Sequence, residues 1–285
     1  MKFFADTASL KEIEYCFSRG VNDGITTNPK IIESTGDLSM GFEAACKSIL
    51  EKYSNVPVSL ETDLRGIELN SIHKNPIQVR DTLLKQAYEL SSWAKNVIVK
   101  IPICEGGLLA AEELMNRGIQ TNITACMNVQ QAMEAKDRGI GYISLFANRM
   151  LDSYILQLSG HSLNEIVSNP NWKKALEENK AKYFEQAWGL TLRDISQVAD
   201  SLSSSKQELI IGSIRSPEDI YRIISAKPQV ITIPTKIVQG LENITGLKLA
   251  GRRISSQKSP LLVYHPMTEY TLAEFEKAAD AYRKR

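Results

Sequence analysis

The sequence lacks the residue patterns that mark metalloproteins and disulfide-rich secreted proteins. Its four cysteines are scattered along 285 residues and form no Cys-x-x-Cys pair, which favours reduced thiols over disulfides or a zinc site. Its three histidines lie far apart and show no ligand spacing. We therefore expect no metal site in this chain.

The sequence also lacks long apolar runs and a strong charge of either sign. No apolar segment approaches the ~18 residues that a membrane-spanning helix needs, and the N-terminal residues turn polar too soon for a signal peptide. A net charge of +1 predicts no basic surface for nucleic acid. These absences predict a cytoplasmic protein whose partners include neither a membrane nor a nucleic acid, and an apolar fraction of 43% is sufficient for a large core.

What the sequence does contain is a repeated alternation of short apolar segments and amphipathic helices. Three of the helices end in an arginine, a glycine and an apolar residue, at Gly20, Gly118 and Gly139, which marks repeated helix-to-strand junctions. No glycine-rich phosphate-binding motif follows the first strand, which disfavours an open Rossmann sheet. Strands are expected at residues 3–6, 24–29, 56–62, 96–102, 120–124, 142–146, 208–212 and 229–233.

Eight strands, each followed by a helix, predict a parallel (β/α)8 TIM barrel rather than an open sheet. We expect a single domain over residues 1–285, with the barrel at about 1–245 and a C-terminal extension and helix at about 246–285. Ser9-x-x-Glu12 is expected to cap the first helix and Thr271-x-x-Glu274 to open the last one. That last helix can cover the barrel mouth, dock on a neighbouring subunit, or pack on its own barrel as a solvated helix.

The segment from Asn96 to Pro102 contains one unexpected residue. Its β-branched residues predict a strand that is buried on both faces, and Lys100 is its only charged residue. An ammonium group in such a strand loses hydration, which favours the neutral amine, and a neutral, positioned lysine can attack a carbonyl to form a Schiff base. The alternative is a lysine whose stem lies on apolar surface while its head reaches water, and for a lone lysine this alternative is favoured.

Other polar residues recur at the ends of the predicted strands and strengthen the catalytic hypothesis. Side chains alternate across a strand, so residues two apart share a face, and barrel active sites lie at the carboxyl ends of the strands. Each polar residue alone also fits a structural role, as a turn cap, a backbone contact or a surface group, but together they favour a site. The residues in phase are Asp6, Ser59, Glu61, Lys100, Asn122, Thr124, Ser144, Phe146, Ser213 and Arg215.

Schiff-base chemistry needs residue types that this set contains. Loss of water from a carbinolamine and cleavage of a carbon–carbon bond require proton transfer, for which Asp6 is the candidate. Glu61 and Thr124 can hold the water that carries protons to and from the lysine nitrogen. Asn28 and Asn122 offer neutral hydrogen bonds to sugar hydroxyls.

An anion site is expected after the seventh strand. Ser216 is placed to cap a helix whose first residue is Pro217. A helix N-terminus next to Arg215 binds phosphate well, and the loops after strands seven and eight are a common phosphate site in barrels. Arg149, just past the sixth strand, is the candidate for a second cation.

Five motifs, in this order, resemble those of the transaldolase family, in its shorter form that includes fructose-6-phosphate aldolases. The resemblance runs from about residue 2 to residue 237, and the TTNP and VKIP elements are the most specific. The motifs are Phe4–Ala8, Gly24–Pro29, Val97–Pro102, Thr121–Thr124 and Gly212–Arg215.

The resemblance implies a (β/α)8 barrel that needs neither cofactor nor metal and transfers a dihydroxyacetone unit between sugar phosphates through a lysine Schiff base. By motif position it also implies a role for each candidate. Lys100 is the Schiff-base lysine, Asp6 the proton-transfer carboxylate, Glu61 and Thr124 the water-holding pair, Asn28 and Asn122 the hydroxyl binders, Ser144 a neighbour of the three-carbon unit, and Arg149, Ser213 and Arg215 the phosphate contacts.

Two positions distinguish the branches of the family that the chain resembles. Aldolase-type members tend to carry glutamine at the place of Glu61 and tyrosine at the place of Phe146, so both residues here are of the transaldolase type. A phenol would help to protonate and release the three-carbon unit, and phenylalanine cannot. Leu145 in place of the usual proline, and Asn148, depart from the transaldolase pattern.

We therefore predict a transaldolase, expected to be a homo-oligomer, whose small-molecule partners are sugar phosphates such as fructose 6-phosphate or sedoheptulose 7-phosphate. Three alternatives stay open. They are a fructose-6-phosphate aldolase that frees dihydroxyacetone, a transaldolase that acts on a sulfonated sugar, and a non-catalytic barrel that binds sugar phosphates.

Overall fold

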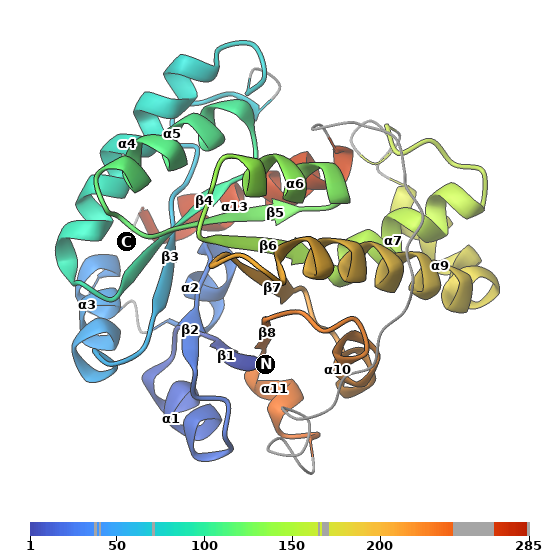
Figure 1. The fold of residues 1–285 in the computed structure, drawn as a ribbon, viewed down its shortest axis with the longest axis horizontal. Helices are drawn as coiled ribbons and strands as arrows, with labels where there is room; N and C mark the ends of the chain where they lie inside the picture. The colour runs from blue at the N-terminus through green and yellow to red at the C-terminus, as the bar shows by residue number, and fades with distance from the viewer. Residues whose placement is uncertain are drawn as a thin grey trace.

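Eight parallel strands close into a barrel in the computed structural model, in the order in which they follow one another along the chain (Figure 1). The structure describes residues 1–36, 39, 41–69, 72–164, 166, 171–241 and 265–283. The last strand pairs with the first, and this closure confirms the predicted (β/α)8 barrel. The strands are β1 (Lys2–Asp6), β2 (Gly24–Thr26), β3 (Val58–Glu61), β4 (Val97–Pro102), β5 (Thr121–Cys126), β6 (Tyr142–Phe146), β7 (Glu208–Gly212) and β8 (Val230–Ile233).

Helices surround the barrel and alternate with its strands (Figure 1). Within the described part of the chain, no helix combines the length and apolarity that crossing a membrane requires. The part of the predicted C-terminal extension that precedes the last helix, from about residue 246 to residue 264, lies outside the described residues. The helices are α1 (Leu10–Ser18), α2 (Pro29–Thr35), α3 (Phe42–Lys52), α4 (Pro76–Trp93), α5 (Glu105–Asn116), α6 (Val129–Asp137), α7 (Ala147–Leu158), α9 (Trp172–Leu202), α10 (Pro217–Ile224), α11 (Thr235–Val238) and α13 (Pro266–Arg283).

Strand β4 illustrates how side-chain alternation separates the core from the site. All six of its residues are buried. Val97, Val99 and Ile101 belong to the apolar layer between the strands and the helices, and burial of each such side chain contributes about 1.5–3 kcal/mol. A slip of one residue would move Lys100 into that layer, so the apolar residues fix the register that points Lys100 into the barrel.

The interior of the barrel near the amino ends of the strands is filled by apolar side chains. Phe4, Ile210 and Val230 form a cluster of their own there, apart from the layer under the helices. Gly24 on the neighbouring strand makes room for this cluster, because a Cβ at Gly24 would lie 2.7 Å from the ring of Phe4. The free space of the barrel is therefore left at the carboxyl ends of the strands.

Some helices begin at the cap that their local sequence indicates, and others do not. The side chains of Asn128 and Ser216 accept hydrogen bonds from backbone N–H groups three residues on, at 2.8 and 3.3 Å, as expected for N-caps. Ser9 makes no such bond. The Glu12 carboxylate that was predicted to complete its capping box instead accepts hydrogen bonds from the hydroxyls of Thr7 at 2.5 Å and Thr235 at 2.9 Å, so a tertiary contact competes with the local motif.

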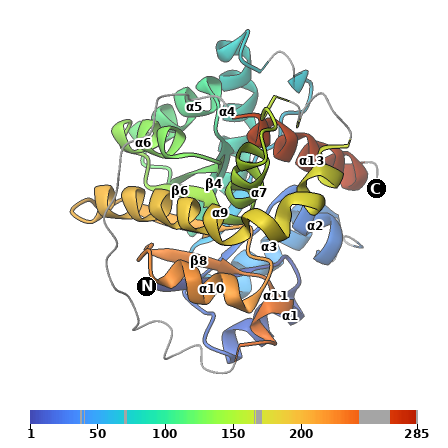
Figure 2. The ribbon, with the colours of Figure 1, turned by 90° about the vertical axis from the view of Figure 1, so that its right-hand side faces the viewer.

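The last helix begins earlier than predicted. Helix α13 starts at Pro266, and the ring Nδ1 of His265 accepts a hydrogen bond from the backbone N–H of Met267 at 3.1 Å. Thr271 therefore lies inside the helix and does not open it. Helix α13 packs against α2, α7 and β5 of its own barrel (Figure 2).

The junction between β7 and α10 depends on one buried carboxylate. Asp219 is 5% exposed, and its Oδ2 accepts from the backbone N–H of Arg215 at 2.8 Å, from that of Ser216 at 3.1 Å and from Asn148 Nδ2 at 2.6 Å. Replacement of Asp219 by alanine leaves these donors unpaired, so we expect the free energy of unfolding to fall by about 3 kcal/mol. Urea unfolding of D219A checks this, with the exposed neighbour Glu218→Ala as control; equal effects of the two changes would contradict it.

Candidate active site

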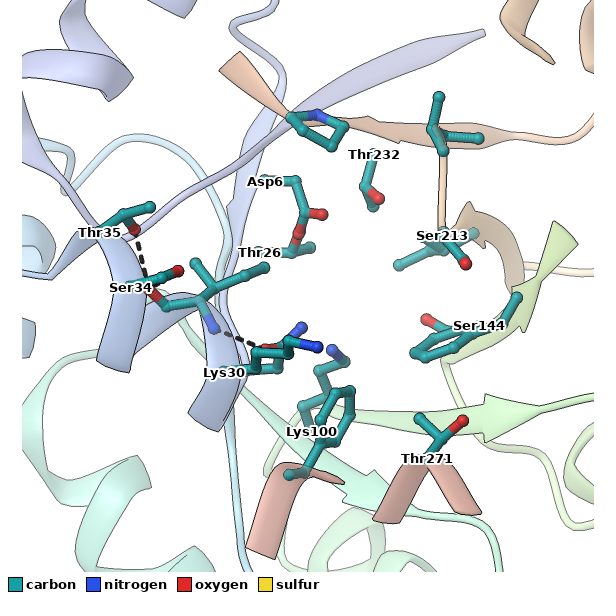
Figure 3. A pocket seen from close by; sticks show the side chains of 18 of the residues that line it. Asp6, Thr26, Lys30, Ser34, Thr35, Lys100, Ser144, Ser213, Thr232 and Thr271 are labelled. Atoms are coloured by element: carbon teal, nitrogen blue, oxygen red, sulfur yellow. Dashed lines mark hydrogen bonds between the residues drawn. The ribbon is translucent and has the colours of Figure 1, made fainter. Parts of the chain in front are cut away.

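A cavity of about 470 Å³ opens at the carboxyl ends of the strands (Figure 3). Its walls come from six of the strands and from segments as distant in sequence as helices α2 and α13. Most of the predicted site residues meet here although the chain separates them widely. Those that line the cavity are Asp6, Asn28, Lys100, Ser144, Phe146, Arg149 and Ser213.

Lys100 is buried at the base of this cavity. Its side chain is 6% exposed, and its Nζ lies 2.8 Å from Oε2 of Glu61, whose side chain is 1% exposed. The ammonium also donates a hydrogen bond to the backbone carbonyl of Thr27 at 3.2 Å. This arrangement contradicts the snorkelling alternative, because the amine points into the barrel and is held by a buried carboxylate.

The carboxyl group of Asp6 points into the same cavity (Figure 3). Burial raises its pKa above the ordinary value, and the charge of Lys100 and a hydrogen bond from the Thr26 hydroxyl offset only part of that shift. The Thr26 Oγ1 donates to Asp6 Oδ1 at 2.8 Å and fixes the carboxyl group. An acid whose pKa is raised holds its proton more readily than an ordinary carboxyl group, which suits a group that must both take and return a proton.

Glu61 is the second acid next to the lysine. Burial raises its pKa above the ordinary value, although the neighbouring Lys100 pulls in the opposite direction. Strand register places Glu61 level with Lys100, and Lys100 level with Asn122. A carboxylate in this position can take a proton from the ammonium and leave a neutral, nucleophilic amine.

Asn122 and Thr124 lie beside the lysine strand and do not line the cavity. Both are 0% exposed. Asn122 Oδ1 accepts a hydrogen bond from the Ser144 hydroxyl at 2.8 Å, while the Asn122 amide nitrogen and the Thr124 hydroxyl find no hydrogen-bond partner among the described residues. Buried polar groups are normally paired, so these two positions are places where a water or a substrate group is expected.

The remaining predicted residues of the sugar site border the cavity. Asn28 lines the cavity and caps helix α2 with its Oδ1, which accepts from the backbone N–H of Ile31 at 2.8 Å. The ring of Phe146 lies 5.9 Å from the Lys100 nitrogen and offers no hydroxyl.

The predicted anion residues do not all meet in the cavity. Ser213 and Arg149 line it, and Arg149 is paired with Glu274 of helix α13 at 2.5 Å. Arg215 does not line it, because both ends of its guanidinium are held by Asp152, at 2.8 and 2.6 Å. The sequence pattern placed Arg215 near the site but could not show that a buried carboxylate from α7 already holds it.

Several polar residues of the cavity were not predicted. Lys100 was singled out because it is a polar residue in an apolar strand. The same criterion also applies to Thr26 and Thr232. Lys30 and Thr271 carry no such signal, because they lie on helices and reach the cavity only through tertiary packing. The polar residues of the lining that the sequence patterns missed include Thr26, Lys30, Thr232, Lys236 and Thr271.

Comparison with known proteins agrees with this geometry. The family model of transaldolase/fructose-6-phosphate aldolase matches residues 3–284. A probable transaldolase of Lactiplantibacillus plantarum is 30% identical over 237 residues, which cover 83% of this chain and 87% of the relative. A probable transaldolase of Aquifex aeolicus is 30% identical over 241 residues, covering 85% and 88%. The chain belongs to the transaldolase/fructose-6-phosphate aldolase family.

Proposed function

We propose that this protein is a transaldolase that moves a dihydroxyacetone unit from a ketose phosphate to an aldose phosphate through a Schiff base on Lys100. The observation that carries the proposal is the buried pair of Lys100 and Glu61, 2.8 Å apart, facing a cavity that the carboxyl group of Asp6 also lines. Family membership supports the reaction class.

The first half-reaction begins with transfer of a proton from Lys100 to Glu61. The neutral amine attacks the ketone carbon, and the carbinolamine loses water to give the iminium ion. Thr124, whose hydroxyl lacks a partner among the described residues, and Glu61 are proposed to hold the water that carries these protons. Asn28 and Asn122 are proposed to bind hydroxyls of the three-carbon unit beside Ser144.

Cleavage follows when the Asp6 carboxylate takes the proton of the C4 hydroxyl. The C3–C4 bond breaks, its electrons pass into the iminium group to give an enamine, and the aldose leaves. A second aldehyde then accepts the enamine carbon while Asp6 returns the proton, and water releases the new ketose from Lys100. Phe146 next to the nitrogen has no acidic hydroxyl, which favours waiting for an acceptor over protonation and release of dihydroxyacetone.

The anionic end of the substrate is proposed to bind at Arg149 and Ser213. Arg149 would exchange its contact with Glu274 for the anion, and Glu274 is partly exposed and can move. Arg215 is proposed to join them only if it leaves Asp152, which is 2% exposed and holds it at two points. Arg149 is therefore the principal cation of this proposal.

Borohydride trapping with fructose 6-phosphate, with and without erythrose 4-phosphate, tests the proposal. We expect the mass of the peptide that contains Lys100 to increase by a reduced three-carbon adduct, and sustained turnover only when the acceptor is present. Release of dihydroxyacetone without an acceptor would instead identify an aldolase. If the peptide mass stays unchanged with every ketose tested, including sulfonated ketoses, the result would favour a non-catalytic barrel that binds sugar phosphates.

A further inference from the structure

The hydroxyl of Thr271 is an unexplained polar group in the wall of the cavity. Thr271 lies on helix α13, lines the cavity and is 1% exposed. Its Oγ1 is buried and finds no hydrogen-bond partner in the part of the chain that the structure describes. Figure 3 shows the side chain reaching from the helix toward the space that Ser144 and Lys100 also border.

A threonine inside a helix ordinarily has a simple partner. Its hydroxyl can bond a backbone carbonyl of the preceding turn, and buried hydroxyls are nearly always paired. The hydroxyl of Thr268, one turn earlier on α13, is paired outside its own helix: it donates to the carbonyl of Ala125 at 2.8 Å and accepts from Gln131 Nε2 at 3.1 Å. Thr271 differs from Thr268 in two ways: its hydroxyl has no partner among the described residues, and the residue forms part of the cavity wall.

Helix α13 cannot easily turn to hide this hydroxyl. The bonds of Thr268 hold the helix to β5 and α6 on one side of Thr271. On the other side, the side chain of Phe275 is buried, and its ring lies 6.4 Å from the ring of Phe146 on β6. Thr271 is thus fixed at the cavity wall between two anchors, and desolvating its hydroxyl without a partner costs stability.

We propose that Thr271 is a substrate-binding residue, whose hydroxyl exchanges a hydrogen bond with a hydroxyl group of the polyhydroxy ketose in the cavity. This inference rests on the proposed function and extends it to the C-terminal helix. A substrate hydroxyl supplies the partner that the described residues lack, and a threonine hydroxyl can both donate and accept. Helix α13 is then part of the active site rather than a cover over the barrel.

The test compares Thr271→Val, which removes the hydroxyl and keeps the shape, with Thr271→Ser, which keeps the hydroxyl. We expect T271V to raise KM for fructose 6-phosphate about tenfold, the effect of one lost hydrogen bond, with kcat changed by less than about twofold. T271S should stay within about twofold of the wild type in both constants. The unfolding midpoint of T271V should not fall, because the hydroxyl has no partner to lose.

Thr268→Val is the matched control on the same helix. It removes a hydroxyl that is fully paired, so its unfolding midpoint should fall. A KM of T271V equal to that of the wild type, or a midpoint lowered as much as that of T268V, would overturn the proposal. Borohydride trapping distinguishes failure of the proposed function from failure of this inference. If the wild type forms no adduct on Lys100, the proposed function is refuted. If T271V forms the adduct at the same ketose concentrations as the wild type, only the role of Thr271 is refuted.

Discussion

Replacement of Lys100 by methionine is expected to abolish the covalent adduct and to lower kcat by about 10⁴-fold or more, because it removes the proposed nucleophile. Lys236 and Lys30 also line the cavity, but neither is buried beside a carboxylate as Lys100 is beside Glu61. Borohydride trapping with fructose 6-phosphate, followed by peptide mass analysis, measures the loss. If K100M forms an adduct on another lysine, that lysine and not Lys100 would be the nucleophile.

The same change has a predicted cost in stability that depends on pH. Removal of Lys100 leaves Glu61 buried without its cation, and breaking a buried pair in this way destabilises proteins by about 3–5 kcal/mol. Burial raises the pKa of Glu61, so a protonated Glu61 forms more readily in the folded state and the deficit should shrink as the pH falls. Thermal unfolding at pH 8 and pH 5 measures this, and the double change Lys100→Met with Glu61→Gln should restore stability at both values.

Replacement of Asp6 by asparagine is the second large expected effect. Asparagine keeps an oxygen that can accept the hydrogen bond of Thr26 and cannot take the C4 hydroxyl proton, so kcat should fall about 10²- to 10⁴-fold. Lys100 and Glu61 are unchanged, so the Schiff base should still form with dihydroxyacetone and still be trapped. Steady-state kinetics together with trapping separate these steps, and loss of both would assign Asp6 to adduct formation instead.

The raised pKa of Asp6 gives this prediction a pH signature. In the proposed mechanism the carboxylate form of Asp6 is the base for cleavage, so kcat/KM of the wild type should fall as the pH drops through this raised pKa. The stability effect has the opposite direction: a raised pKa in the folded state destabilises the protein as the pH rises above the unfolded value. D6N should therefore be more stable than the wild type at neutral pH and equal to it at low pH. A D6N enzyme that is less stable at neutral pH would contradict the burial argument.

The ion pairs at the cavity mouth suggest how charge is balanced before an anionic substrate arrives. Glu274 lies 2.5 Å from Arg149 and 3.7 Å from Lys30, and the two cations lower the pKa of its carboxyl group. Asp152 likewise forms an ion pair with Arg215, but its carboxylate is buried. Exchange of an anion with a partly exposed carboxylate costs less desolvation than exchange with a buried one, which is why Arg149 is the better candidate for the anion.

Local sequence patterns were reliable where the decisive interactions are local or follow the strand period. The apolar alternation of β4 predicted both the buried strand and the inward direction of Lys100, since apolar burial fixes the register. The cap of Ser216 was predicted correctly because its partner, the backbone N–H of Asp219, is three residues away. Ser9 has the same kind of pattern and does not cap, because Glu12 is drawn to the hydroxyls of Thr7 and Thr235.

The site itself was predicted only in part. The polar residues in phase at strand ends gave Asp6, Lys100 and Ser144, because a closed barrel brings all carboxyl ends of its strands together. The ion pair between Arg215 and Asp152 joins the loop after β7 to helix α7. The spacing of polar and apolar residues along the sequence does not predict such a contact between distant segments. The position of Thr271 depends on where α13 packs, which its amphipathic pattern alone does not specify.

By itself the sequence determined the barrel, the strand that carries the lysine and the end of the barrel where the chemistry is proposed. These follow from residue periods that any chain of this pattern must satisfy in order to bury its apolar surface. Only the tertiary structure decided that Glu61 pairs with the lysine, that carboxylates already pair with both predicted arginines, and that Thr271 of α13 forms part of the cavity wall. Those outcomes depend on contacts between residues far apart in the chain, where several partners compete and the packing of whole helices selects one.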